Sequence, residues 1–162
     1  MKAIVARARE WRKGPAIAVA HGEGVPYDTR MTKPQGGGTP FGELLGMRCV
    51  HKEKNLARYE LEVVADHLNK RGVAHGGVVA SLLDTALGAS VVFSLTPEEW
   101  TGTLELSVQF REAVRPGVVV AEGRLARRGR SVAFAEGEIR DAAGKILASA
   151  HGVWTIWPKK PD

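Results

Sequence analysis

A His-Gly-Gly triplet at residues 75–77 precedes an aspartate, Asp84, that stands inside a long apolar segment. If a helix begins at the triplet, its first N–H groups are unpaired and carry a partial positive charge, and the glycines leave them unshielded. Such amides can hold an oxygen on which negative charge grows during attack on an acyl carbonyl. A carboxylate among apolar residues costs free energy unless it has a partner, so Asp84 is a candidate functional residue.

Both features also have structural explanations. The glycines could serve only to permit a tight turn into the helix, and Asp84 could be bonded to a backbone group or to Thr85. The neighbouring residues, however, are ordered: Gly77, Ser81, Asp84 and Gly88 follow each other at intervals of four, three and four residues. On a helix this spacing makes one narrow polar or small stripe. Gly77 and Ser81 are therefore candidate substrate-binding residues.

Two helices are expected around these residues. The apolar segment from Gly77 to Leu95 is too long for an ordinary strand and has no proline before Pro97, so it predicts a helix. Apolar residues occupy most of its circumference, which indicates a helix surrounded by protein. A shorter helix is expected at FGELLG, because Thr39-Pro40 is typical of a helix start and Gly46 of a helix end.

Six segments have strand character, two before the long helix and four after it. Turns are expected at Lys54-Asn55, RRGR and DAAGK, and the predicted strands are residues 47–53, 56–64, 103–110, 117–126, 131–140 and 145–156. Gly123, Gly137 and Gly152 lie inside three successive strands, where glycine indicates strong curvature or close approach of another backbone. We therefore expect an α+β fold, a curved antiparallel sheet wrapped around one long central helix.

The run HLNKRGVAHGGVVASLLDTALGAS resembles the signature of the PaaI-like (phenylacetate-pathway-type) thioesterases, a branch of the hotdog-fold superfamily. The similarity continues through GTPFGELLGM upstream and through VQFREAVRPG, RRGRSVAFAEGEIRD and GKILASAHGVW downstream. Residues 1–38 lie outside it; they contain seven Lys or Arg, three acidic residues and a Pro/Gly-rich stretch. We interpret residues 1–38 as an N-terminal arm and residues 39–162 as a hotdog thioesterase domain.

The resemblance implies hydrolysis of an acyl-CoA to the free acid and coenzyme A, without a metal or another cofactor. It assigns the thioester oxygen chiefly to the Gly76 amide, and attack or water activation to Asp84. Asn69 matches the position that helps to orient the carboxylate or water, and Thr103 falls where some members carry a serine or threonine for the same purpose. His75 is expected to position the substrate, with capping of the helix as the alternative.

The same resemblance implies a site built from two subunits, with Asn69 and the triplet from one chain and Asp84 and Thr103 from the other. The protein is therefore expected to form a homodimer, and pairing of dimers into a homotetramer is the further expectation.

A net charge of +5 and a pI near 9.6 suit a polyanionic partner. No RNP-like aromatic pattern, zinc finger or helix-turn-helix signature accompanies the charge, so we expect coenzyme A rather than nucleic acid. Arg127, Arg128 and Arg130 cluster in a predicted hairpin turn and are candidate ligands of coenzyme A phosphates. The alternative for them is a solvated basic loop.

Composition indicates one domain, because 162 residues with 44% hydrophobic content can bury a sizeable core. The lone Cys49 cannot form an intramolecular disulfide, and no cysteine or histidine pair has zinc-ligand spacing, which fits a reducing cytoplasm. No secretory signal or membrane-spanning apolar run is recognisable, so no membrane partner is expected. The remaining alternatives are a non-catalytic acyl- or nucleotide-binding hotdog module and a hotdog hydratase or dehydratase.

Overall fold

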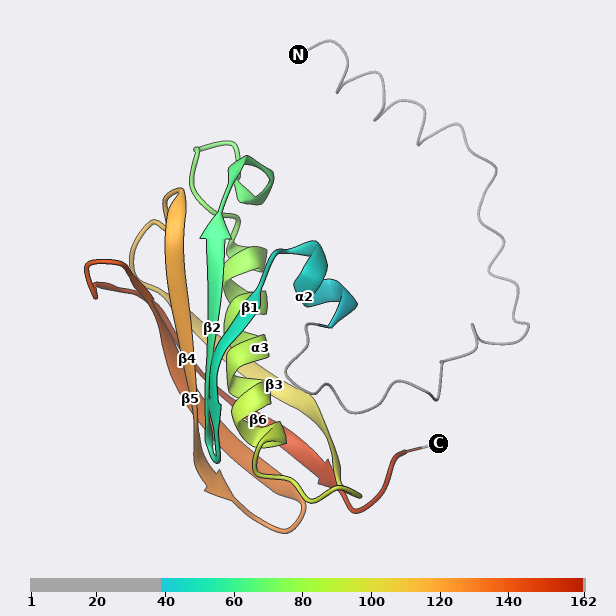
Figure 1. Cartoon of the computed structure of the whole chain (residues 1–162). Helices are drawn as coiled ribbons and strands as arrows, with labels where there is room; N and C mark the ends of the chain where they lie inside the picture. Colours follow the sequence, from blue (N-terminus) through green and yellow to red (C-terminus); the bar gives the residue numbers. More distant parts are fainter. Residues whose placement is uncertain (1–38, 162) are drawn as a thin grey trace, which may run out of the picture. The chain divides into compact units, whose positions relative to one another are not determined.

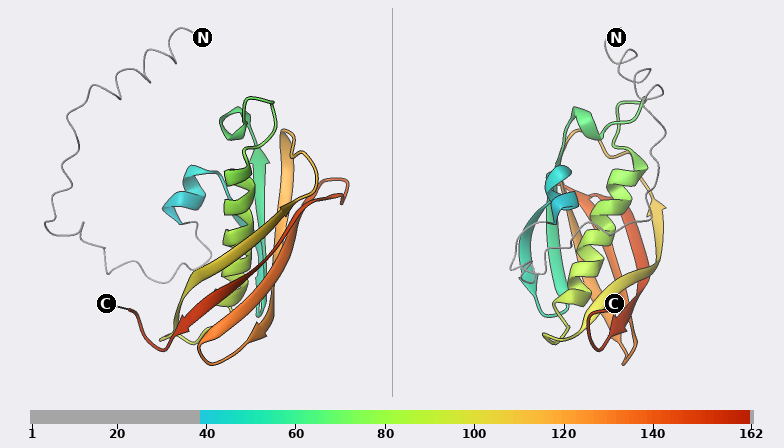
Figure 2. Two further views of the ribbon diagram at one scale, coloured as in Figure 1. Left: turned by 180° about the vertical axis from the view of Figure 1, so that it is seen from behind. Right: turned by 90° about the vertical axis from the view of Figure 1, so that its right-hand side faces the viewer.

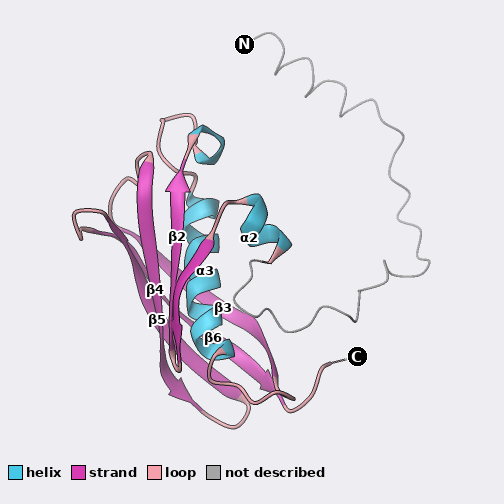
Figure 3. Ribbon diagram, viewed as in Figure 1, coloured by secondary structure: helices cyan, strands magenta, loops and turns pink. Residues whose placement is uncertain are grey.

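The computed structural model describes residues 39–161, so the expected arm at 1–38 lies outside the described residues. One curved sheet and one long helix dominate this part of the chain (Figures 1 and 3). The elements are α2 (Pro40–Leu44), β1 (Arg48–Glu53), β2 (Leu56–Val63), the 3-10 helix η1 (Ala65–His67), α3 (Gly76–Val92), β3 (Trp100–Phe110), β4 (Gly117–Arg128), β5 (Val132–Asp141) and β6 (Ile146–Trp157).

The six strands form one antiparallel sheet in the order β1-β2-β4-β5-β6-β3. Helix α3 lies along one face of this sheet and packs against every strand from β2 to β6 (Figure 2). The hotdog architecture expected from the sequence is thereby confirmed. None of the described helices is both long enough and apolar enough to span a bilayer.

One expectation about α3 is wrong for the single chain. Sheet and loops cover only one side of the helix, where Leu83, Ala86 and Leu87 are fully buried. The opposite side is open: Gly77 is exposed, and Asp84 is only partly buried. The apolar residues of α3 therefore extend onto a side that the described sheet leaves open.

The glycines inside β4, β5 and β6 have the role predicted for them. A Cβ atom at Gly123 would collide with the backbone of α3 at Ala86. A Cβ atom at Gly137 would stand 2.7 Å from the Leu87 side chain. These two glycines are direct partners across β4 and β5, so the missing side chains let the helix settle onto the middle of the sheet.

The predicted start and end of the short helix and the predicted turn at Lys54-Asn55 are also confirmed. The Thr39 hydroxyl accepts a hydrogen bond of 3.0 Å from the Gly42 N–H and caps α2, which has Pro40 at its first position. Gly46 adopts a φ of 71° where this helix ends, and Asn55 a φ of 69° in the β1–β2 turn. The short helix η1 was not predicted.

A β-bulge in β3 changes which residues face the helix. Thr103 is paired with Trp154 of β6, but the next pair along the strand is Glu105 with Val153, so Leu104 is an extra residue. Residues seven apart on a regular strand point to opposite faces. Because of the bulge, Thr103 and Phe110 both reach α3.

Candidate active site

The carboxylate of Asp84 is held by a hydroxyl from the edge of the sheet. Asp84 lies near the middle of α3, and the Thr103 Oγ1 of β3 donates a hydrogen bond of 3.0 Å to its Oδ1. The second carboxylate oxygen has no hydrogen-bond partner among residues 39–161. One oxygen is therefore fixed while the other stays available to a water molecule or a substrate carbonyl. The predicted pairing of Asp84 with Thr103 is present within one chain.

An apolar cavity of about 420 Å³ adjoins this carboxylate. Its walls combine α2, α3, β2, β3 and β6 and contain four aromatic side chains: Phe41, Tyr59, Phe93 and Trp154. Burial, and secondarily the adjacent Cys49 thiol, raises the pKa of the Tyr59 phenol to about 12, so the phenol is neutral at physiological pH. The cavity can take an apolar group attached to a carbon that lies beside Asp84.

The start of α3 forms the second part of the predicted site. His75 caps the helix, and its Nδ1 accepts a hydrogen bond of 2.9 Å from the Gly77 N–H. A neutral imidazole that accepts at Nδ1 carries its proton on Nε2, from which it can donate to a ligand. The Gly77 amide is therefore occupied, whereas the Gly76 amide has no partner among the residues that the structure describes.

Phe110 is a candidate site residue that the sequence did not reveal. It ends β3 and is 58% exposed, and its ring carbon Cε1 would lie 3.5 Å from a Cβ atom at Gly76. Its ring therefore stands beside the free Gly76 amide. No local signal identifies it, because its direction depends on the bulge at Leu104, six residues earlier.

Asn69 shapes the turn that leads into α3. Its Oδ1 accepts a hydrogen bond of 2.8 Å from the Arg71 N–H, and its own N–H donates to the Val73 carbonyl at 2.8 Å. An antiparallel bridge between Leu68 and Ala74 closes the turn. Asn69 thus fixes the approach to the His-Gly-Gly triplet and makes no hydrogen bond to Asp84 in this chain.

A single chain does not bring the two groups of candidate residues together. His75, Gly77 and Ser81 line a separate cavity of about 470 Å³, whereas Asp84 and Thr103 line the aromatic cavity. Gly76 and Asp84 are eight residues apart on one helix, which separates them by roughly 12 Å along its axis. That distance is too long for one thioester carbonyl to touch both.

The three candidate arginines divide into two kinds. Arg128, near the end of β4, donates from Nη2 to both carboxylate oxygens of Glu99, at 2.6 and 2.5 Å, and from Nη1 to the Ser94 carbonyl at 3.3 Å. It therefore ties β4 to the loop after α3. Arg127 and Arg130 are exposed and form no ion pair within residues 39–161. They remain the candidates for a phosphate ligand.

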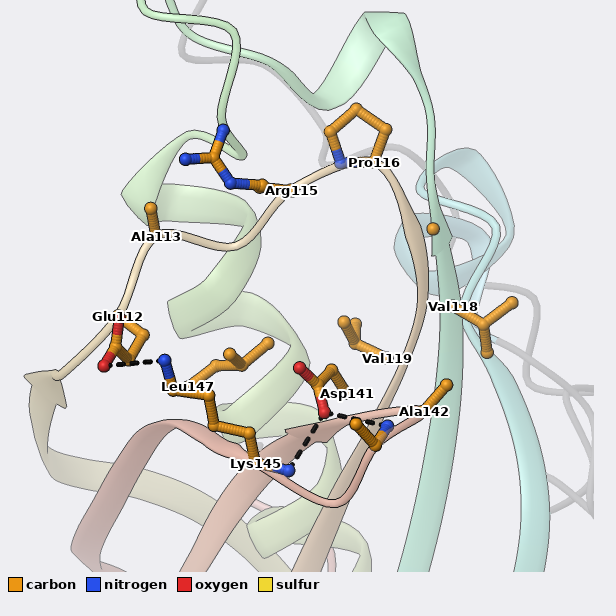
Figure 4. A pocket seen from close by; sticks show the side chains of 12 residues that line it. Glu112, Ala113, Arg115, Pro116, Val118, Val119, Asp141, Ala142, Lys145 and Leu147 are labelled. Carbon is orange, nitrogen blue, oxygen red and sulfur yellow. Dashed lines mark hydrogen bonds and ion pairs between the residues drawn. The ribbon is translucent and has the colours of Figure 1, made fainter.

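A cavity of about 570 Å³ lies away from all of these residues, between the β3–β4 loop and the β5–β6 hairpin (Figure 4). The Lys145 ammonium pairs with Glu112 at 2.9 Å, and Asp141 accepts hydrogen bonds from the backbone of the hairpin. These interactions stabilise the β5–β6 hairpin and its contact with the β3–β4 loop. None of the predicted site residues lines it.

Sequence comparison with known proteins finds similarity over most of the described residues. Residues 71–148 match the model of the thioesterase superfamily, a range that includes His75, Gly76, Asp84 and Thr103 and begins just after Asn69. A protein of Saccharolobus solfataricus that is named as an esterase is 31% identical over 70% of this chain and 81% of its own. The medium/long-chain acyl-CoA thioesterase YigI of Escherichia coli is 28% identical over 72% of this chain and 85% of its own.

Solved structures show the same arrangement of sheet and helix. A mutant of the phenylacetic acid degradation protein PaaI from Thermus thermophilus superposes with a TM-score of 0.67 and is 27% identical, covering 72% of this chain and 98% of its own.

Proposed function

Because the chain belongs to the thioesterase superfamily, we propose that it hydrolyses an acyl-CoA to the free acid and coenzyme A, with Asp84 as nucleophile or general base. The observation that carries this proposal is the Asp84 carboxylate, fixed by Thr103 on one oxygen and free on the other, beside an apolar cavity. An inert acyl-binding module has no need of an oriented carboxylate at that position.

The complete site requires two subunits. Strand β3 is at the edge of the sheet and pairs only with β6 among the described strands, so its outer hydrogen-bonding groups can pair with a second copy. A two-fold axis through its middle makes the two copies of β3 antiparallel, which sets the Thr103 end of one against the Phe110 end of the other. Thr103 is hydrogen-bonded to Asp84, and the Phe110 ring lies beside Gly76.

The same pairing therefore brings Asp84 of one chain toward the partner subunit's Gly76. The exposed side of α3 and the exposed Phe110 ring are covered in such a dimer. This explains why the helix is apolar on a side that its own sheet does not reach. We further propose that two such dimers pair into a homotetramer.

The reaction has two routes that these groups can support. In the first, Asp84 takes a proton from water as the water oxygen attacks the thioester carbon; in the second, the carboxylate itself attacks and water then cleaves the resulting anhydride. In both, the carbonyl oxygen becomes negative and the partner subunit's Gly76 N–H stabilises it. Collapse of the tetrahedral intermediate breaks the C–S bond, and the coenzyme A sulfur takes up a proton.

A thiol-release assay with Asp84→Asn tests the proposal. The amide keeps the size of the side chain and can still accept from Thr103, but it has no negative charge, so kcat is expected to fall at least about a hundredfold. The melting temperature should stay at or above that of the wild type, because Asp84 has no cationic partner among the described residues.

Retention of most of the thiol release in the folded Asp84→Asn protein would overturn the assignment of Asp84. A wild-type protein that releases no thiol from aromatic, short or long acyl-CoAs would overturn the proposed function itself. An acyl-CoA that is modified without losing its thioester would instead support the hydratase alternative.

A further inference from the structure

We propose that Gly88 is the specificity-determining residue of the acyl pocket, and that its missing side chain leaves room for a ring-sized or branched acyl group over α3 beside Asp84. This inference rests on the proposed thioesterase function and goes beyond it by naming the place of the acyl group. It concerns the substrate rather than the reaction, since Gly88 offers no side chain for chemistry.

The position of Gly88 on α3 supports this role. It follows Asp84 by four residues, so it lies one turn further along on the same side of the helix. Both residues line the aromatic cavity of about 420 Å³. A group bonded to a carbonyl carbon next to Asp84 therefore passes over Gly88 if it extends along the helix toward Val92.

The Trp154 side chain forms the opposite wall of the cavity at Gly88, and it has no room to move away. A Cβ atom at Gly88 would stand 3.3 Å from Nε1 of Trp154, which is tighter than an ordinary van der Waals contact. Trp154 is only 1% exposed and belongs to the hydrophobic core under α3. Any side chain at position 88 must therefore occupy the cavity itself or force the core apart.

The remaining walls suit an apolar acyl group with a flat or bulky shape. Tyr59 and Phe93 contribute ring surfaces, and Val92 contributes an aliphatic one at the end of α3. Aromatic walls bind flat apolar groups over a large area. The pantetheine arm of coenzyme A is the competing occupant; it is narrow and carries amides that need hydrogen-bond partners.

The test compares Gly88→Ala and Gly88→Val with the wild type on acetyl-CoA and phenylacetyl-CoA. One added methyl group in a filled apolar pocket changes kcat/KM by about tenfold or more. For phenylacetyl-CoA we expect a fall of about tenfold in Gly88→Ala and more in Gly88→Val, with acetyl-CoA changed less than about threefold. Val92→Ala, at a 45% exposed position, should shift the ratio in the opposite direction.

Two further measurements make the outcome decisive. Ala142→Val adds volume at an exposed position in the β5–β6 turn, outside both cavities, and should leave the substrate ratio unchanged. Binding of a non-hydrolysable thioether analogue of phenylacetyl-CoA, measured by calorimetry, should weaken in Gly88→Val, and inhibition by free coenzyme A should not change. Because this binding needs no hydrolysis, it tests the pocket even if the wild type proves inactive.

Equal losses with both substrates, together with weaker inhibition by free coenzyme A, would overturn the inference and place the pantetheine arm over Gly88. Unchanged kinetics and analogue binding in Gly88→Val, in a protein that melts like the wild type, would show that the cavity holds no part of the substrate.

Discussion

The Thr103 hydroxyl donates a hydrogen bond to the Asp84 carboxylate at 3.0 Å and joins the edge strand β3 to the middle of α3. Replacing Thr103 with valine keeps the shape of the side chain and removes this donor. A hydrogen bond to a charged group contributes about 1.5 to 3 kcal/mol, so kcat is expected to fall roughly ten- to a hundredfold with little change in KM. Thr103→Ser retains the hydroxyl and should keep most of the activity. Equal losses in both variants would show that the hydroxyl is not what matters.

The Gly76 amide can be removed without breaking the helix. Gly76 is the first residue of α3, where proline is well tolerated, and His75 has a ψ of 138° that permits a following proline. Gly76→Pro should therefore fold and melt close to the wild type, while kcat falls about a hundred- to a thousandfold through loss of one oxyanion donor. Gly76→Ala keeps the N–H group and places its methyl at an ordinary 3.5 Å from Phe110. An active Gly76→Pro protein would reassign the oxyanion donor.

Mixed dimers test whether the site is shared between subunits. If Asp84→Asn and Gly76→Pro chains are co-expressed and mix at random, half of the dimers are mixed, and one of the two sites in each mixed dimer is intact. The preparation should then recover about a quarter of the wild-type thiol release, although each variant alone is nearly inactive. Light scattering should show a dimer or a larger even assembly. No recovery in a dimer confirmed to contain both chains would place the whole site within one chain.

Replacing the arginines at the β4–β5 hairpin should have two different effects, one on KM and one on stability. Arg127→Ala/Arg130→Ala is expected to raise KM for acyl-CoA with kcat nearly unchanged, and the difference from the wild type should shrink at high salt. Arg128→Ala removes the partner of Glu99, costs up to about 1 kcal/mol, and should lower Tm by about 2 to 4 °C. An unchanged KM in the double variant would identify Arg127 and Arg130 as a solvated loop.

The sequence alone determined the long helix, the strands and the candidate catalytic residues that lie on them. The helix start at His75 and the stripe that contains Asp84 are patterns over neighbouring residues, and helix periodicity converts them directly into positions. Gly123 and Gly137 likewise predicted the close approach of another backbone, because glycine inside a strand is unfavourable without such a reason.

Only the tertiary structure decided which of these residues meet. A single extra residue, Leu104, lets Thr103 and Phe110 both face α3, and strand alternation in the sequence gave no sign of it. The partnership of Arg128 with Glu99 and the position of Trp154 under Gly88 likewise join residues far apart along the chain.

The physical reason is the range of the interactions. Propensity, capping and periodicity act over a few residues, so a sequence displays them directly. Contacts across a sheet depend on the register of strands that are brought together only by burial of the whole core, and one bulge reverses every side chain beyond it. The open side of α3 follows the same rule, because its exposure depends on how far the sheet extends around the helix and not on the residues next to it in sequence.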